Sequence, residues 1–197
     1  MTSLKKLLWG AVLGCAIGGA TVLWPARALP EATSITIPIE TVVDYIHAVI
    51  AADREVYTKH AMERMQVKGV VAVAEKYEEK NTLPLPAQFL LESGRHLDKM
   101  GVGVQYRLIS SWPINKRNIA ANALENIGLG HVVTDPDRPY KGVTKVGDTR
   151  YFEAIYADRA VTPSCAGCHN AHPNSPRRDF KLNDVIGAIV VSVQLDQ

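Results

Sequence analysis

The sequence is poor in cysteine, and it has no low-complexity tract, no internal repeat and no basic stripe. Only three cysteines occur among its 197 residues, and the formal net charge is +2. Three basic residues, Lys5, Lys6 and Arg27, lie in the first 28 positions, where no acidic residue occurs; the rest of the chain has 19 basic and 20 acidic residues. A near-neutral body of this kind gives no reason to expect nucleic-acid binding.

The first 28 residues have the pattern of an export signal. Lys5 and Lys6 precede an uncharged, mainly apolar run over residues 7–24, and Ala26-Arg27-Ala28 is a small-residue cleavage site. A cleaved signal peptide is therefore the favoured interpretation of residues 1–28. It leaves residues 29–197 as one domain in the periplasm.

Two alternatives to cleavage stay open. The apolar run is long enough to span a bilayer, and Gly10, Gly14 and Gly18 within it would let two such helices approach closely, so the segment also fits a retained membrane anchor. A lipid anchor at Cys15 is a weaker alternative, because the apolar run continues past that cysteine. All three interpretations place the following domain outside the cytoplasm.

One pentapeptide near the end of the chain, Cys165-Ala166-Gly167-Cys168-His169, has the pattern C-x-x-C-H. Two thiols at this spacing can form thioethers to both vinyl groups on one edge of a porphyrin, and the imidazole that follows is placed under the iron. The pattern therefore predicts one covalently attached haem c, held by Cys165 and Cys168, with His169 as the proximal iron ligand. If residues 1–28 are removed, no further cysteine remains for a structural disulfide.

Redox and zinc chemistry are the alternatives for this pentapeptide. A redox C-x-x-C would follow a strand, open a helix at its first cysteine and lie in a βαβ unit. Here Thr162-Pro163-Ser164 precedes it, and a loop rich in Pro, Asn and Ser follows. A structural zinc site needs four ligands; His172 is a candidate third ligand, but there is no second cysteine pair.

The hydrophobic periodicity predicts helices in the first half of the chain and strands mainly in the second. We expect helices at about 39–74, with an end or bend at Gly69, at 86–99, and at 118–127, where Gly128 and Gly130 close the helix. Residues 75–81 are expected to be a charged, solvated stretch. Strands are expected at about 104–112, 142–146, 149–157 and 184–195. The dipeptide Gly147-Asp148 predicts a hairpin turn. The fold class is therefore α+β with an antiparallel sheet, and the haem segment lies on a loop or short helix before the last strand.

Several segments of this chain match a known family. They are Ala52-Asp53-Arg54-Glu55-Val56-Tyr57, Leu83-Pro84-Leu85-Pro86-Ala87-Gln88, Ser111-Trp112-Pro113-Ile114-Asn115, Tyr151-Phe152, Tyr156-Ala157-Asp158, Cys168-His169-Asn170, His172-Pro173, Ser175-Pro176, Asp179-Phe180-Lys181 and Asp184-Val185-Ile186-Gly187. In these the chain resembles a bacterial family of single-haem c-type domains with a PAS-like fold. Its members include a stand-alone cyanobacterial haem protein and periplasmic sensor modules of histidine kinases and chemoreceptors.

The resemblance implies a PAS-like antiparallel sheet with flanking helices, a long N-terminal helix, haem bound through the pentapeptide, and a sensory or redox role. Two departures matter. The cyanobacterial relative is ligated on the distal side by a cysteine, and the mature chain here has none to spare. The sensor relatives continue into a transmembrane helix and a signalling domain, whereas this sequence ends at Gln197, so we expect a separate partner protein.

The second axial ligand of the iron is not fixed by the sequence. His60, one turn beyond Tyr57 on the first helix, is the first candidate, and an exposed helix histidine is the alternative. Three methionines at positions 62, 65 and 100 are further candidates, and an open or water-bound iron is another. Arg54 and Tyr57 are candidate distal hydrogen-bond donors to a diatomic gas. His172 follows the proximal ligand too closely to reach the opposite face.

Other residues around the pentapeptide have two interpretations each. Arg159, Arg177 and Arg178 are either partners of the haem propionates or exposed charges. Trp112 and Phe180 are assigned to packing.

Three functions follow from these features. The first is an exported monohaem protein that senses redox state or a small gas (NO, CO or O2) and signals to a redox or kinase partner. The second is a periplasmic electron carrier with six-coordinate haem. The third, an enzyme acting at an open haem, ranks lowest because no distal His–Arg pair is close in sequence. A homodimer stays open in each case.

Overall fold

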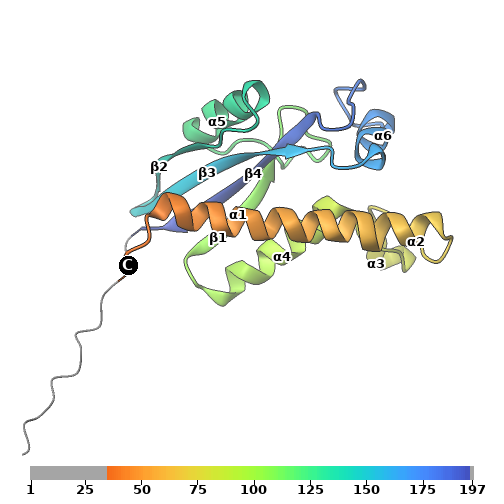
Figure 1. The fold of residues 1–197 in the computed structure, drawn as a ribbon, viewed down its shortest axis with the longest axis horizontal. Coiled ribbons are helices and arrows are strands. Elements are labelled where there is room, and N and C mark those ends of the chain that lie inside the picture. Colours follow the sequence, from red (N-terminus) through yellow and green to blue (C-terminus); the bar gives the residue numbers. More distant parts are fainter. Residues whose placement is uncertain (1–34, 196–197) are drawn as a thin grey trace, which may run out of the picture. The chain divides into compact units, whose positions relative to one another are not determined.

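The computed structural model describes residues 35–195, so the predicted export segment lies outside the described residues. Four strands form one sheet in the order β1-β4-β3-β2, and every neighbouring pair is antiparallel (Figure 1). They are β1 (Val104–Ile109), β2 (Tyr140–Val146), β3 (Thr149–Arg159) and β4 (Val185–Gln194). The α+β prediction is confirmed, and an antiparallel sheet with flanking helices is the PAS-like arrangement that the sequence led us to expect.

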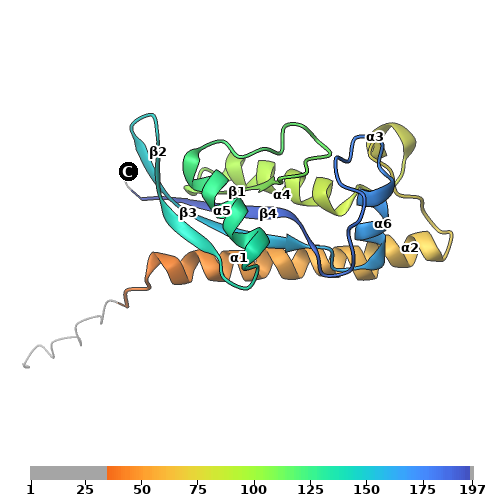
Figure 2. The same cartoon turned by 90° about the horizontal axis from the view of Figure 1, so that it is seen from above.

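Helices cover both faces of the sheet. Helices α1 (Ile39–Val56) and α4 (Pro86–Met100) lie on one face, and α5 (Ala123–Thr134) lies on the other (Figures 1 and 2). Side chains alternate along a strand. On β3, Phe152, Ala154 and Tyr156 pack with α1 and α4, while Ile155 packs with α5. Burial on both faces explains why the β4 sequence is continuously apolar.

The first helical segment is shorter and less regular than predicted. Helix α1 passes into a π-helical turn, η1 (Tyr57–Met62), and then into α2 (Glu63–Val67). The segment ends at Gly69, which has a φ of 64°, as expected, and residues 70–74 form no further helical turn. A further short helix, α3 (Tyr77–Lys80), occupies a stretch predicted to be only solvated. Within residues 35–195, no helix has the length and apolarity needed to cross a bilayer.

Helix α5 begins and ends later than the sequence indicated. The predicted helix at 118–127 was closed by Gly128 and Gly130, but both glycines lie inside α5. The helix begins after Asn122, whose side chain accepts a hydrogen bond of 2.8 Å from the backbone N–H of Glu125. Gly128 faces the sheet, where a Cβ atom would lie 2.9 Å from the side chain of Ile155. Close packing, not helix termination, explains this glycine.

The hairpin and the last strand agree with the prediction. Strands β2 and β3 pair in antiparallel orientation. Val146 lies opposite Thr149, so the two-residue turn is Gly147-Asp148. Gly147 has a φ of 61°, a conformation that glycine adopts without steric cost.

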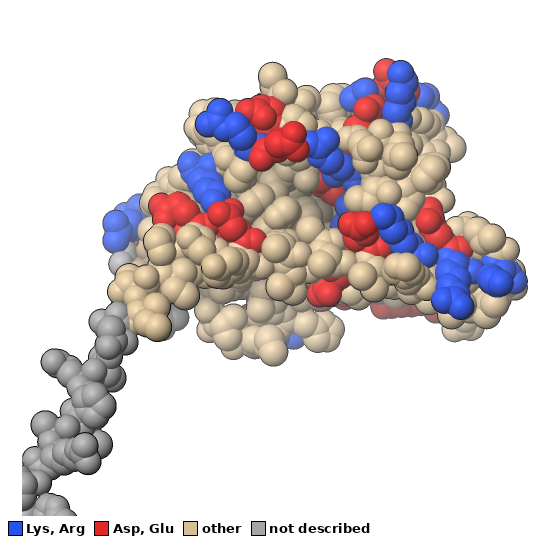
Figure 3. Space-filling model, viewed as in Figure 1, with Lys and Arg blue, Asp and Glu red and all other residues tan. Residues whose placement is uncertain are grey.

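Charges are interspersed on the face seen in Figure 3, where basic and acidic side chains lie beside one another. Lys141, for example, lies 2.6 Å from Asp44.

The two glycines of α5 give opposite predictions. Gly128→Ala should lower the free energy of unfolding by about 1–3 kcal/mol, because the new methyl group meets the fully buried Ile155. Gly130→Ala should raise it by about 0.5–1 kcal/mol, because a Cβ there meets nothing within 4 Å and alanine favours the helix. Urea denaturation of both variants measures the difference. Equal effects would contradict the packing of α5 on the sheet.

Candidate functional site

The predicted haem pentapeptide lies on a short helix, α6 (Pro163–Ala171), between β3 and β4. Thr162 precedes the helix and Pro163 occupies its first position, where a proline is well tolerated. Cys165 lies in the first turn, and Cys168 and His169 follow at three- and four-residue spacing, which places all three on neighbouring positions of one helix surface. Of the two predicted settings, a loop or a short helix, the structure has the helix.

Packing anchors the other side of α6. Ala166 is buried in a small cluster with Ala160, Phe180 and Ile186, and Cys165 packs against this cluster. Because Ala160 directly follows β3 and Ile186 lies near the start of β4, these contacts fix α6 to one end of the sheet. This packing holds the helix that carries the two cysteines and the histidine in a fixed position on the sheet.

The local structure around Cys165 resembles that of a redox C-x-x-C more than the sequence indicated. Helix α6 begins two residues before Cys165 and follows β3 closely. The flanking strands, however, pair antiparallel, so the segment is not the βαβ unit of a thioredoxin-like site. The topology, rather than the local helix, separates this site from that class.

A large cavity opens between α6 and the long N-terminal helical segment. Its volume is about 930 Å³, at the upper end of the range of about 300–1,000 Å³ that small-molecule and cofactor sites occupy. The two cysteines at 165 and 168 and His169 line it together. The opposite and lateral walls come from other elements and include Arg54, Met62, Gln66, Val73, Leu85, Leu91, Leu108, Trp112, Ile114, Lys116, Arg117, Asn118, Asp158 and Ile186.

His169 has the properties of a ring available for ligation. Its Nδ1 is buried and has no hydrogen-bond partner among the described residues. The ring meets the Phe180 ring edge-on, with 5.7 Å between centroids. Burial lowers the pKa of His169, and the positive charge of Arg54 lowers it further. The imidazole is therefore neutral at neutral pH, which is the form that binds a metal.

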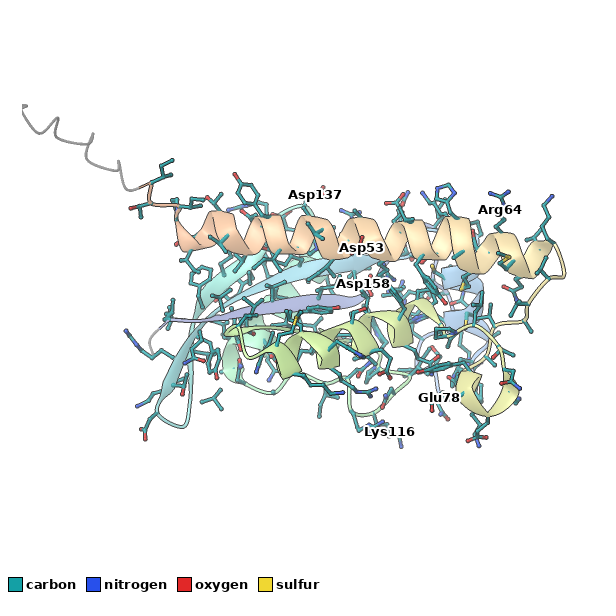
Figure 4. The ribbon with its side chains drawn as sticks, turned by 90° about the horizontal axis from the view of Figure 1, so that it is seen from below. Asp53, Arg64, Glu78, Lys116, Asp137 and Asp158 are labelled. Atoms are coloured by element: carbon teal, nitrogen blue, oxygen red, sulfur yellow. The ribbon has the colours of Figure 1, made fainter. Side chains whose placement is uncertain are left out.

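A buried ion pair lies in the wall of the same cavity. Arg54 on α1 and Asp158 on β3 are 2.6 Å apart, and both side chains are about nine-tenths buried. Figure 4 shows Asp158 on the side of the sheet that α1 and α4 cover. Burial raises the pKa of Asp158, and the adjacent guanidinium opposes that shift. The pair joins the long helix to the end of β3, four residues before α6 begins.

The comparisons with known proteins bear on this arrangement. The model of the Tll0287-like family matches residues 30–194. The chain belongs to the Tll0287-like family. A solved structure described as that of the cyanobacterial heme-protein Tll0287 shares 13% identity with a TM-score of 0.48, covering 82% of this chain and 99% of that chain. No curated protein sequence matches. The resemblance stated from the sequence motifs is confirmed at the level of the family.

In this Tll0287-like domain, only some of the residues predicted for the distal side line the cavity. Arg54 lines the cavity, as expected for a pocket residue. Tyr57 does not: its hydroxyl donates a hydrogen bond of 2.6 Å to the carbonyl of Pro84, and its ring stacks on Phe89. His60 is exposed and is not among the cavity-lining residues. The prediction for these residues rested on α-helical spacing. Residues 57–62 instead form a wider π turn, which changes the side chains that face the cavity.

The arginines near α6 have partners of their own. Arg159 forms an ion pair of 2.6 Å with Asp137. Arg177 lies over the rings of Trp112 and Phe180, at 4.7 and 4.4 Å from their centroids. Arg178 donates hydrogen bonds to the carbonyl of Asn170, in the last turn of α6, and to that of Pro173, in the loop that follows. The packing role predicted for Trp112 and Phe180 agrees with these contacts.

Two cavity residues were not anticipated from the sequence. Lys116 and Arg117, exposed on the loop after β1, are among the residues that line the cavity. Nothing in the local sequence marks them, because only the sheet topology brings this loop beside α6. Arg54, which also lines the cavity, is buried.

The buried pair predicts a large loss of stability when one partner is removed. Arg54→Met should lower the free energy of unfolding by about 3–5 kcal/mol, because it leaves the Asp158 carboxylate buried without a cation. Adding Asp158→Asn should restore part of this loss. Chemical denaturation of the full chain measures both.

The matched control for this pair is Lys59→Met. Lys59 forms an exposed ion pair with Glu55 on the same helical segment, and its loss should change stability by at most about 0.5 kcal/mol. If Arg54→Met costs no more than this control, the pair does not anchor α1 to β3.

Proposed function

We propose that the protein is an exported c-type haem protein that holds one haem in the cavity beside α6 and senses redox state or a small gas for a separate partner. The observation that supports it most is the placement of Cys165, Cys168 and His169 on one short helix in the wall of a cavity of cofactor size. Membership of the Tll0287-like family, and the description of one similar structure as that of a heme-protein, support haem binding.

The residues of α6 have distinct roles in this proposal. Cys165 and Cys168 would hold the haem through two thioether bonds; adding a thiol across a vinyl group keeps all atoms and needs no oxidant. His169 would bind the iron as its proximal ligand, and its burial and lowered pKa suit that role. Lys116 and Arg117 suit pairing with propionates. Bound haem supplies an iron centre that changes oxidation state or binds a diatomic ligand.

The sensing role is supported by the composition of the cavity wall. Arg54 and Met62 on the long helical segment line the same cavity as His169. A change in charge or ligation at the iron would therefore act on the packing of that segment. The export proposal rests on the signal pattern of residues 1–28.

Electron transfer is the second candidate function, and one observation favours it. Cys168 is exposed, although it lines the cavity. A haem joined to an exposed cysteine has one edge near solvent, where a redox partner protein can dock. Optical spectra with and without CO or NO separate the candidates, because inertness to both gases excludes gas sensing.

The haem proposal predicts covalent attachment that depends on two of the three cysteines. Exported together with haem-maturation factors, the full chain should give a c-type pyridine haemochrome and retain haem on a denaturing gel. Cys165→Ala with Cys168→Ala should abolish haem retention. Cys15→Ser, the third cysteine of the sequence, is the control and should leave the haem unchanged. A wild-type chain without covalent haem would overturn the proposal.

A further inference from the structure

Few side chains in the cavity wall have a group that can bind iron opposite His169. Side chains that serve as a second axial haem ligand carry a thioether, thiolate, imidazole, amine or phenolate. Beyond α6 itself, the described lining residues with such groups are Met62, Lys116 and His172. The local geometry distinguishes these three.

His172 is committed elsewhere. Its Nε2 lies 2.9 Å from Oε1 of Glu75, and its Nδ1 accepts a hydrogen bond of 3.1 Å from the backbone N–H of Asn174. Both ring nitrogens therefore have partners. It also directly follows α6, which holds the proximal ligand. Lys116 is exposed on its loop, where its ammonium group stays hydrated.

Met62 differs from both in burial and position. Its side chain is 5% exposed, whereas Met65 and Met100 are 39% and 72% exposed. It closes the π-helical turn η1, and such turns occur frequently at functional sites. Met62 comes from the long helical segment, while His169 comes from α6, and both line one cavity.

The π turn explains why Met62 faces the cavity. Ile50, Arg54, Thr58 and Met62 are all buried and follow one another at four-residue steps. In an α-helix each such step drifts by about 40° around the axis, so a straight helix would turn Met62 away from the Arg54 side. The wider turn over residues 57–62 offsets this drift.

We infer that the Met62 thioether is the second axial ligand of the haem iron, opposite His169. This inference rests on the proposed haem site and narrows its function. A thioether is a soft ligand that favours the reduced iron and raises the reduction potential. It also occupies the position that a gas would take. The quantity sensed at this site is then redox state, and a gas binds only by displacing Met62.

Spectroscopy of the haem-loaded full chain tests the inference. The wild type should be low-spin, with the weak long-wavelength ferric band of a thioether–iron bond and a strongly upfield-shifted methionine methyl resonance in the ferrous state. Met62→Leu keeps the side-chain volume but removes the sulfur. It should lose both signals, bind CO readily as the ferrous protein, and have a lower reduction potential than the wild type.

Two further variants complete the test. Met65→Leu, on the same helical segment but exposed, is the matched control and should keep both thioether signals. Met62→His should restore a low-spin spectrum without them. Thioether signals that persist in Met62→Leu, or a high-spin wild type, would overturn the assignment while leaving the haem proposal intact. A wild type without a haemochrome would overturn both.

Discussion

The ion pair between Arg54 and Asp158 links the two parts of the fold that build the site. Asp158 lies near the end of β3, just before α6, and Arg54 lies on α1, just before the π turn. Two opposite charges removed from water are stable only when they stay together. The pair therefore fixes the distance between α1 and the start of α6. Both residues of the pair line the cavity between these elements.

The sheet gives this cavity a rigid base. Antiparallel β3 and β4 carry apolar side chains to both faces, and α6 is inserted where the two strands end. Its one buried face packs on Phe180 and Ile186, which leaves its cysteines and histidine for the cavity. The same topology brings the loop after β1 to the cavity, with Lys116 and Arg117.

Much of this could be predicted from the sequence because the relevant signals are local. Strand alternation and the Gly147-Asp148 turn give the sheet, and the spacing of Cys165, Cys168 and His169 gives the haem hypothesis. Errors arose where tertiary packing overrides local preference. Gly128 was assigned to a helix end, although it is needed for the contact of α5 with Ile155. The π turn has no signature in composition, so the sequence does not show that His60 is exposed and Met62 buried.

The central claim is that this domain carries one haem bound covalently through α6. The most direct measurement is the intact mass of the exported chain, determined under denaturing conditions after coexpression with haem-maturation factors. The account predicts the mass of the polypeptide plus one haem, with the added mass located on the peptide that contains Cys165 and Cys168. The mass of the polypeptide alone would contradict it.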